Sequence, residues 1–193
     1  MGKLAEQVAA FTRLVSCGNV EIYNEFSLQH EFGIFLRNRL ANSKVQFERP
    51  TEYFFGSEAS FVKKEIDIAV FSDGMDGTKN LQYSIELKFP RNGQYPEQMF
   101  EFCKDIAFAE QLHDAGFSTA GLVIYVDNHL FYSGRIMNGI YAFFRGNNPI
   151  HGRIVQPTGE RDEEVIVNGT YSVHWQPVDD SLRNFKYAVI EIS

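Results

Sequence analysis

Two short stretches decide the fold, residues 65–71 (EIDIAVF) and residues 85–88 (IELK). Both are mostly apolar, and they are rich enough in isoleucine, valine and leucine to form strands packed in a core. Because successive side chains of a strand point to opposite faces, Glu86 and Lys88 share one face of the second stretch. Asp67 lies within the first stretch. A buried charge without a partner costs several kcal/mol, so acidic groups on such strands require an explanation.

The alternation also predicts how each strand divides between its two faces. In residues 65–71, Ile66, Ile68 and Val70 are expected on one face, with Asp67 on the other. In the second strand, Ile85 and the apolar residues at every second position from it are expected on the face opposite Glu86 and Lys88. Two carboxylates with a lysine beside them can bind a divalent cation and activate a water molecule.

The bulk properties fit one domain with an ordinary core. The chain has 193 residues, of which 44% are hydrophobic and 22% charged, and it carries a net charge of −7. No apolar run approaches the roughly 18 residues of a membrane span, and the N-terminus lacks a signal-peptide pattern. The only cysteines, Cys17 and Cys103, suggest neither a disulfide framework nor a zinc site, so we expect a protein of the reducing cytoplasm. The negative charge requires any nucleic-acid contact to be concentrated in one cleft.

Hydrophobic periodicity and turn residues predict the order of the elements. Ser27 is a good N-cap for the second helix, and an Asn-Gly pair at 168–169 predicts a hairpin. Residues 135–145 are ambiguous between helix and strand. The expected helices are 3–15, 28–41 and 96–115, and the expected strands are 45–47, 64–71, 81–89, 119–126, 165–167, 171–173 and 187–192, with a further β segment at 154–155.

The order strand, helix, strand over 81–126 implies a crossover connection. We therefore expect an α/β fold with a mixed central sheet flanked by helices. Its core would span about residues 20–130, extended by a β-rich part at about 131–193 that packs on the same domain.

Glu31 is a further candidate. It lies three residues after Leu28 and four before Phe35, inside the apolar stripe expected for the helix at 28–41. An acid in that position is at the edge of the stripe, paired with a basic group, or a ligand.

Together these elements resemble the PD-(D/E)xK nuclease superfamily, the restriction-endonuclease-like fold, in an uncharacterised bacterial branch. The resemblance covers residues 28–126: a helix with Glu31, a strand with Asp67, a strand with Glu86-Leu87-Lys88, then a helix and another strand. Ile66 stands where the family has its nominal proline. The motif is short, so its value lies in the strand context and the order of elements.

The resemblance implies Mg²⁺-dependent (or Mn²⁺-dependent) hydrolysis of DNA phosphodiester bonds. Asp67, Glu86 and the backbone carbonyl of Leu87 would hold the metal, and Lys88 would be the catalytic lysine. Glu31 would be an accessory acid that contacts the metal or its water. Duplex DNA is the expected partner, and many nucleases of this fold are homodimers.

Several other polar residues are candidates of lower specificity. Gln98 lies where some exonuclease branches carry a Gln-x-x-x-Tyr element, but here the fifth residue is Phe102. An ordinary place at the start of a helix explains Gln98 equally. Basic residues that could line a phosphate-binding cleft, or lie solvated on the surface, are Lys63, Lys64, Arg91 and Lys104.

Two other interpretations stay open. A non-catalytic member of the same fold could bind nucleic acid or protein, in keeping with the acidic charge. Alternatively, an unrelated α/β protein could use Lys88 to neutralise Glu86 and Asp67 as a buried ion cluster. The sequence does not distinguish endonuclease from exonuclease action or DNA from RNA, and it does not give the number of metals or the pathway.

Overall fold

The stretches around Asp67 and Glu86 form neighbouring antiparallel strands, β2 (Glu65–Asp73) and β3 (Lys79–Lys88). The computed structural model describes residues 3–91, 93–159, 163–179 and 184–193. Within these ranges six strands form one sheet in the order β1-β2-β3-β4-β8-β7, and β5 and β6 form a separate pair. The other strands are β1 (Lys44–Pro50), β4 (Thr119–Val126), β5 (Ile150–Val155), β6 (Glu164–Tyr171), β7 (Gln176–Pro177) and β8 (Lys186–Ile192).

The sheet is mixed because of one crossover. Helix α4 (Tyr95–Asp114) connects β3 to β4, which are parallel, whereas β8 pairs antiparallel with β4. Pro96 lies in the first turn of α4, and Gly116, with a φ of 124°, follows its end. The predicted crossover and the strand at 119–126 are confirmed. Strand β8 comes from the last residues of the chain yet lies inside the main sheet, so the C-terminal part completes the core.

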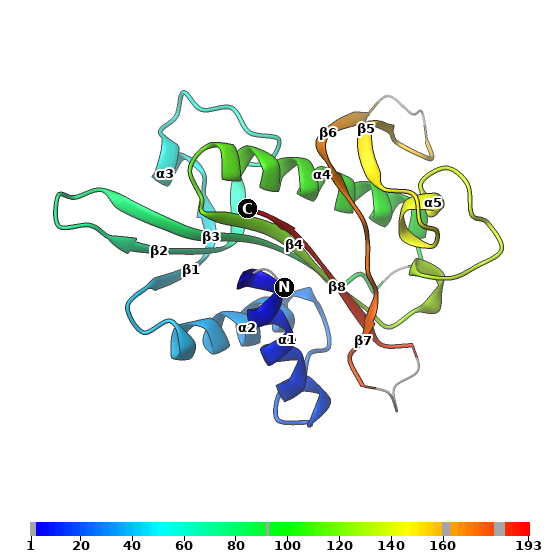
Figure 1. Cartoon of the computed structure of the whole chain (residues 1–193), viewed down its shortest axis with the longest axis horizontal. Coiled ribbons are helices and arrows are strands. Elements are labelled where there is room, and N and C mark those ends of the chain that lie inside the picture. Colours follow the sequence, from blue (N-terminus) through cyan, green and yellow to red (C-terminus); the bar gives the residue numbers. More distant parts are fainter. Residues whose placement is uncertain (1–2, 92, 160–162, 180–183) are drawn as a thin grey trace.

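Helices cover both faces of the sheet (Figure 1). On one face, α1 (Lys3–Ser16) packs its apolar side chains against β4 and β8, and α2 (Glu25–Arg39) packs against β1, β2 and β3. On the other face lies α4, and the β5–β6 pair packs against α4 in turn. The predicted α/β fold, a mixed sheet flanked by helices, is confirmed. Shorter elements are α3 (Glu52–Phe55), a 3₁₀ turn η1 (His129–Phe131) and α5 (Tyr141–Phe144).

Helix α2 begins three residues earlier than predicted. Its N-cap is Asn24, whose side chain accepts a hydrogen bond from the Ser27 N–H at 2.7 Å. The Ser27 hydroxyl in turn accepts from the Asn24 N–H at 3.0 Å, which completes a capping box. The expectation of Ser27 as N-cap is therefore wrong: Ser27 is the third residue of the helix. The earlier start adds Glu25 to α2, on the same side as Gln29 one turn later.

The predicted hairpin across Asn168-Gly169 is wrong. Both residues lie inside β6, which pairs antiparallel with β5. Their backbone N–H groups donate to the carboxylate of Glu110 on α4, at 2.9 and 2.6 Å. A Cβ on Gly169 would come within 2.4 Å of the Tyr171 hydroxyl, so close approach rather than a turn requires this glycine.

Among the helices in the described part of the chain, none has the length and apolar character needed to cross a membrane.

Candidate active site

Strand β2 is distorted at Asp67. The Asp67 N–H donates to Oε1 of Glu86 at 3.3 Å, and its carbonyl accepts from the Gln29 side chain at 2.9 Å. Ile68 packs with α1 and α2, whereas Ile66 packs with α4. The expectation that Ile66 shares a face with Ile68 and Val70 is therefore wrong, because the regular alternation is interrupted at Asp67.

The neighbouring strand is distorted at the same level. In β1, Glu48 has a φ of 47°, and it is the one non-glycine residue with positive φ among those described. Phe47 pairs with Ile68 and Arg49 with Ile66, so Glu48 and Asp67 fall between the same two pairs without pairing with each other. Gln29 bonds to both, since its amide also donates to Glu48 Oε1. Such a backbone conformation costs about 1–3 kcal/mol and is found preferentially at functional sites.

The Asp67 carboxylate lies in a small cavity. Its Oδ2 accepts the N–H of Leu87 on β3 at 2.8 Å. Burial raises the pKa of Asp67 to about 6, against the opposing effect of the ammonium groups of Lys88 and Lys63. The cavity measures about 180 Å³ and is lined by Glu25, Phe26, Gln29, Glu48, Asp67 and Leu87.

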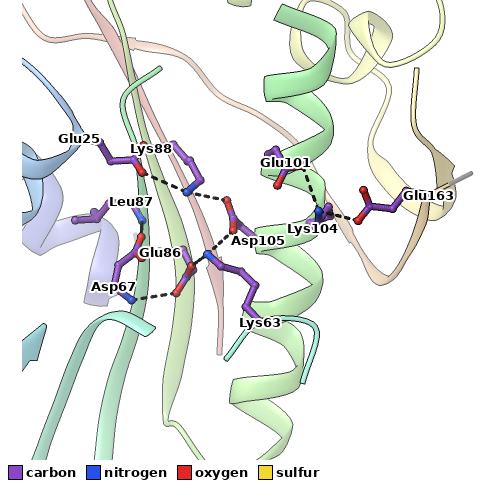
Figure 2. A network of polar contacts seen from close by, with 10 residues as sticks. All are labelled: Glu25, Lys63, Asp67, Glu86, Leu87, Lys88, Glu101, Lys104, Asp105 and Glu163. Carbon is purple, nitrogen blue, oxygen red and sulfur yellow. Dashed lines mark hydrogen bonds and ion pairs between the residues drawn. The ribbon is translucent and has the colours of Figure 1, made fainter. Parts of the chain in front are cut away.

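Glu86 is the most buried acid of the group. Its side chain is 1% exposed, and its Oε2 contacts the ammonium of Lys63, which comes from the loop before β2 (Figure 2). Burial, together with the Asp67 carboxylate, raises the pKa of Glu86 to about 8 even though Lys63 opposes this shift. Glu86 therefore binds a proton more readily than an exposed glutamate does.

Asp105 on α4 links the two lysines (Figure 2). Its Oδ1 accepts from Lys63 Nζ at 2.9 Å, and its Oδ2 lies 3.5 Å from Lys88 Nζ. That second oxygen is buried and accepts no hydrogen bond. Lys88 Nζ also lies 3.5 Å from Oε1 of Glu25, at the start of α2. Burial lowers the pKa of Lys88, but the carboxylates of Asp105, Glu25 and Asp67 outweigh that effect and raise it overall.

The buried cluster has more negative than positive groups. Three carboxylates, those of Asp67, Glu86 and Asp105, surround two ammonium groups, those of Lys63 and Lys88. The half-exposed Glu25 adds a further carboxylate at its edge. If all were ionised, the cluster would carry a surplus negative charge in a poorly solvated place. A bound proton or a further cation would offset that surplus.

Three of the four principal residues chosen from the sequence meet in this cluster, namely Asp67, Glu86 and Lys88. Glu31 does not join them. Its contact is with its neighbour, Nδ1 of His30, at 3.5 Å, and its side chain is 35% exposed. The reason is the rotation of α2 about its axis. Gly33 lies so close to the Phe47 ring that a Cβ would come within 2.0 Å of it, so the flank with Gln29 and Gly33 is buried and Glu31 is turned away.

The candidates of lower specificity differ in whether they lie near the cluster. Gln98 lines a groove of about 490 Å³ next to the cluster, together with Lys88 and Arg91. Lys104 pairs instead with Glu101 and Glu163, while Lys64 is exposed.

Sequence reasoning missed four polar residues of the site: Glu25, Gln29, Glu48 and Asp105. Asp105 carried a usable signal, because it falls between Phe102 and Phe108 on a helix whose surrounding positions are apolar. Lys63 was named only as a basic residue that could line a phosphate-binding cleft, and its place in a loop gave no signal that it meets Glu86 and Asp105.

The structure also bears on the ion-cluster interpretation. The lysine in contact with Glu86 is Lys63, whereas Lys88 pairs with Asp105 and Glu25. Among the described residues, no three or more His, Cys, Asp or Glu side chains are arranged to hold a metal ion.

Comparison of this chain with models of protein families, with curated proteins and with solved structures found no match.

Proposed function

We propose that this protein is a metal-dependent nuclease that hydrolyses phosphodiester bonds of DNA, built like the PD-(D/E)xK enzymes that its motif resembles. One observation carries the proposal. Asp67 and Glu86 are adjacent on neighbouring strands, at the point where the ladder is distorted, in a buried cluster with surplus negative charge. A purely structural cluster would gain nothing from that surplus.

The residues fit a hard divalent cation such as Mg²⁺ or Mn²⁺, which prefers oxygen ligands. The donors are carboxylates, the cluster has negative charge to spare, and Asp105 Oδ2 accepts no hydrogen bond. Asp67 and Glu86 would hold the ion, with the Leu87 carbonyl, whose residue lines the Asp67 cavity, as a third ligand. A bound divalent ion would acidify a coordinated water and stabilise negative charge on the phosphate.

The side chains around Lys88 keep its ammonium charged and hold it in position. Lys88 stays protonated at neutral pH because the surrounding carboxylates raise its pKa, so its ammonium can donate to a phosphate oxygen and orient the attacking water. Asp105 and Glu25 fix the direction of that ammonium from two sides. Glu31 was expected to be an accessory acid that contacts the metal or its water, but the acid of α2 that reaches the cluster is Glu25, through Lys88.

The second candidate is a non-catalytic module of the same architecture. The contact between Lys63 and Glu86 favours it, because an ammonium group already offsets the charge of the proposed ligand. In the nuclease proposal, Lys63 has to leave Glu86 when the metal binds. We also propose a cytoplasmic location, in keeping with the free thiols of Cys17 and Cys103.

The test combines calorimetry with cleavage. Mg²⁺ and Mn²⁺ are titrated into the wild type and into Asp67→Asn, Glu86→Gln and Lys88→Met, with plasmid and linear DNA as substrates. Metal binding lost in the two acid variants, together with cleavage lost in all three, supports the nuclease. Asp114→Asn, an exposed acid at the end of α4, is the matched control. Absence of metal binding at millimolar concentration, with DNA present, would favour the non-catalytic module.

A further inference from the structure

Phe26 is a large apolar side chain that lies exposed on the surface beside the candidate site. Its side chain is 71% exposed, and it is the one exposed phenylalanine among those that the structure describes. It lies in the first turn of α2, directly after Glu25. Single exposed apolar residues are common, so its position rather than its exposure gives it a possible function.

Phe26 lies at the junction of the two cavities of the site. It lines the cavity that holds Asp67 and Leu87, and it also lines the groove that holds Lys88 and Arg91. A phosphate bound near Lys88 would therefore place an adjoining nucleotide within the same groove as the Phe26 ring.

A second aromatic ring continues this surface. The imidazole of His30, one helical turn later, lies nearly parallel to the Phe26 ring, with 11° between the planes and 6.5 Å between the centroids. The His30 side chain is 57% exposed. Tyr23, three residues before Phe26, is 60% exposed. Three exposed rings thus gather at the start of α2.

The charges of the groove make a long duplex a poor ligand. Lys88 is shared between Asp105 and Glu25, and Arg91 contacts Asp127. The whole chain carries a net charge of −7. Non-specific duplex binding depends on phosphate contacts to cations, and these cations are already partly neutralised. Stacking of bases on aromatic rings does not need surplus positive charge, and it requires bases that are not paired.

We propose that Phe26, with His30 beside it, is a stacking platform for an unpaired base, and that the substrate of the proposed nuclease is single-stranded DNA. This inference rests on the proposed function and replaces duplex DNA as the expected partner. Phe26 is then a specificity-determining residue rather than a catalytic one.

The test measures binding separately from cleavage. Fluorescence anisotropy of a labelled oligothymidylate, and of a duplex of equal length, is measured with EDTA present. The proteins are the wild type, Phe26→Ala, Phe26→Trp, and Ile34→Ala as an exposed control on the same helix. Stacking on one ring is worth about 1–3 kcal/mol, so Phe26→Ala should weaken single-strand binding about 5-fold to 150-fold. Phe26→Trp should retain it, and Ile34→Ala should not change it.

Each outcome has a definite meaning. Single-strand binding that is equal in Phe26→Ala and the wild type, or wild-type binding that favours the duplex, would overturn this inference. If the wild type also cleaves DNA and loses cleavage in Asp67→Asn, the nuclease proposal survives that result. If the wild type binds neither DNA in EDTA, this inference fails and the exposed rings would instead be suited to a protein partner, whereas the nuclease proposal is decided separately by metal-dependent cleavage. Unfolding curves of the Phe26 variants, expected to match the wild type, exclude misfolding as the cause.

Discussion

The ammonium of Lys63 contacts the carboxylate of Glu86, although the two residues are 23 positions apart and belong to a loop and a central strand. The same ammonium also donates to a second carboxylate, that of Asp105, at 2.9 Å. Burial disfavours the charge on Lys63, but Glu86, Asp105 and Asp67 outweigh it and raise its pKa. Lys63 is thus an internal cation within the acidic cluster.

Lys63→Met should therefore destabilise the protein without metal. Loss of the cation leaves Glu86 and Asp105 without their shared partner, which should cost about 3 kcal/mol in the free energy of unfolding. Mg²⁺ should stabilise this variant more than the wild type, because in the variant the ion does not compete with the Lys63 ammonium for the carboxylates. Thermal unfolding with and without Mg²⁺ measures both effects. Lys64→Met, at the exposed neighbouring position, is the control. Equal Mg²⁺-induced shifts in wild type and variant would contradict the prediction.

Glu86 should make stability depend on pH. Its pKa is about 8 in the folded protein against 4.5 for an ordinary glutamate. Between these values the folded state holds a proton that the unfolded chain releases, so Glu86 lowers stability as the pH rises through this window. The free energy of unfolding of the wild type should fall relative to that of Glu86→Gln between about pH 5 and pH 8. Urea unfolding at several pH values measures the difference, and parallel curves for the two proteins would refute it.

Glu25 and Glu31 should differ in their effect on activity. Glu25 Oε1 lies 3.5 Å from Lys88 Nζ, and its Oε2 accepts the Phe89 N–H at 3.0 Å. Glu25→Gln keeps an acceptor for that N–H but removes the charge that positions the lysine. We expect kcat to fall about tenfold or more. Glu31→Gln should leave kcat unchanged. Steady-state cleavage assays compare the two, and an equal loss in both would mean that the rotation of α2 described above is wrong.

Glu110 should hold the β5–β6 pair on α4. It is 6% exposed, and its carboxylate accepts from the Asn168 and Gly169 N–H groups and from the Tyr171 hydroxyl. Glu110→Ala leaves these donors without their acceptor, so the free energy of unfolding should fall by about 2–4 kcal/mol. Tyr171→Phe removes one bond and should cost about 1 kcal/mol. Urea unfolding measures both, with Glu101→Ala, a half-exposed acid on the same helix, as control. A loss below about 0.5 kcal/mol for Glu110→Ala, typical of a surface change, would be inconsistent with this role.

The candidate site was only partly predictable. The face shared by Glu86 and Lys88 followed from strand alternation, and both residues lie in the cluster. Glu31 was chosen because it falls within an apolar stripe, but a stripe does not fix how a helix is rotated against its sheet. That rotation depends on the close packing of Gly33 on Phe47, a contact between elements.

The capping error had a similar origin. Ser27 and Asn24 are both good N-cap residues, and the sequence does not decide between them. In the structure the two side chains bond to each other's backbone, so both belong to one capping box. The choice mattered for the site, because it decided whether Glu25 belonged to the helix that faces Lys88.

The sequence by itself determined the kind and order of most elements: the first helix, the crossover helix, the central strands and the mixed sheet that they imply. These follow from periods of 3.6 and 2 residues and from local turn chemistry, which act over a few neighbouring positions. Tertiary structure alone decided which charges meet. Lys63, Glu86 and Asp105 come from a loop, a strand and a helix up to 42 residues apart. Their pairing is fixed by how whole elements pack, because burial and opposite charge, not sequence proximity, set the energy of each contact.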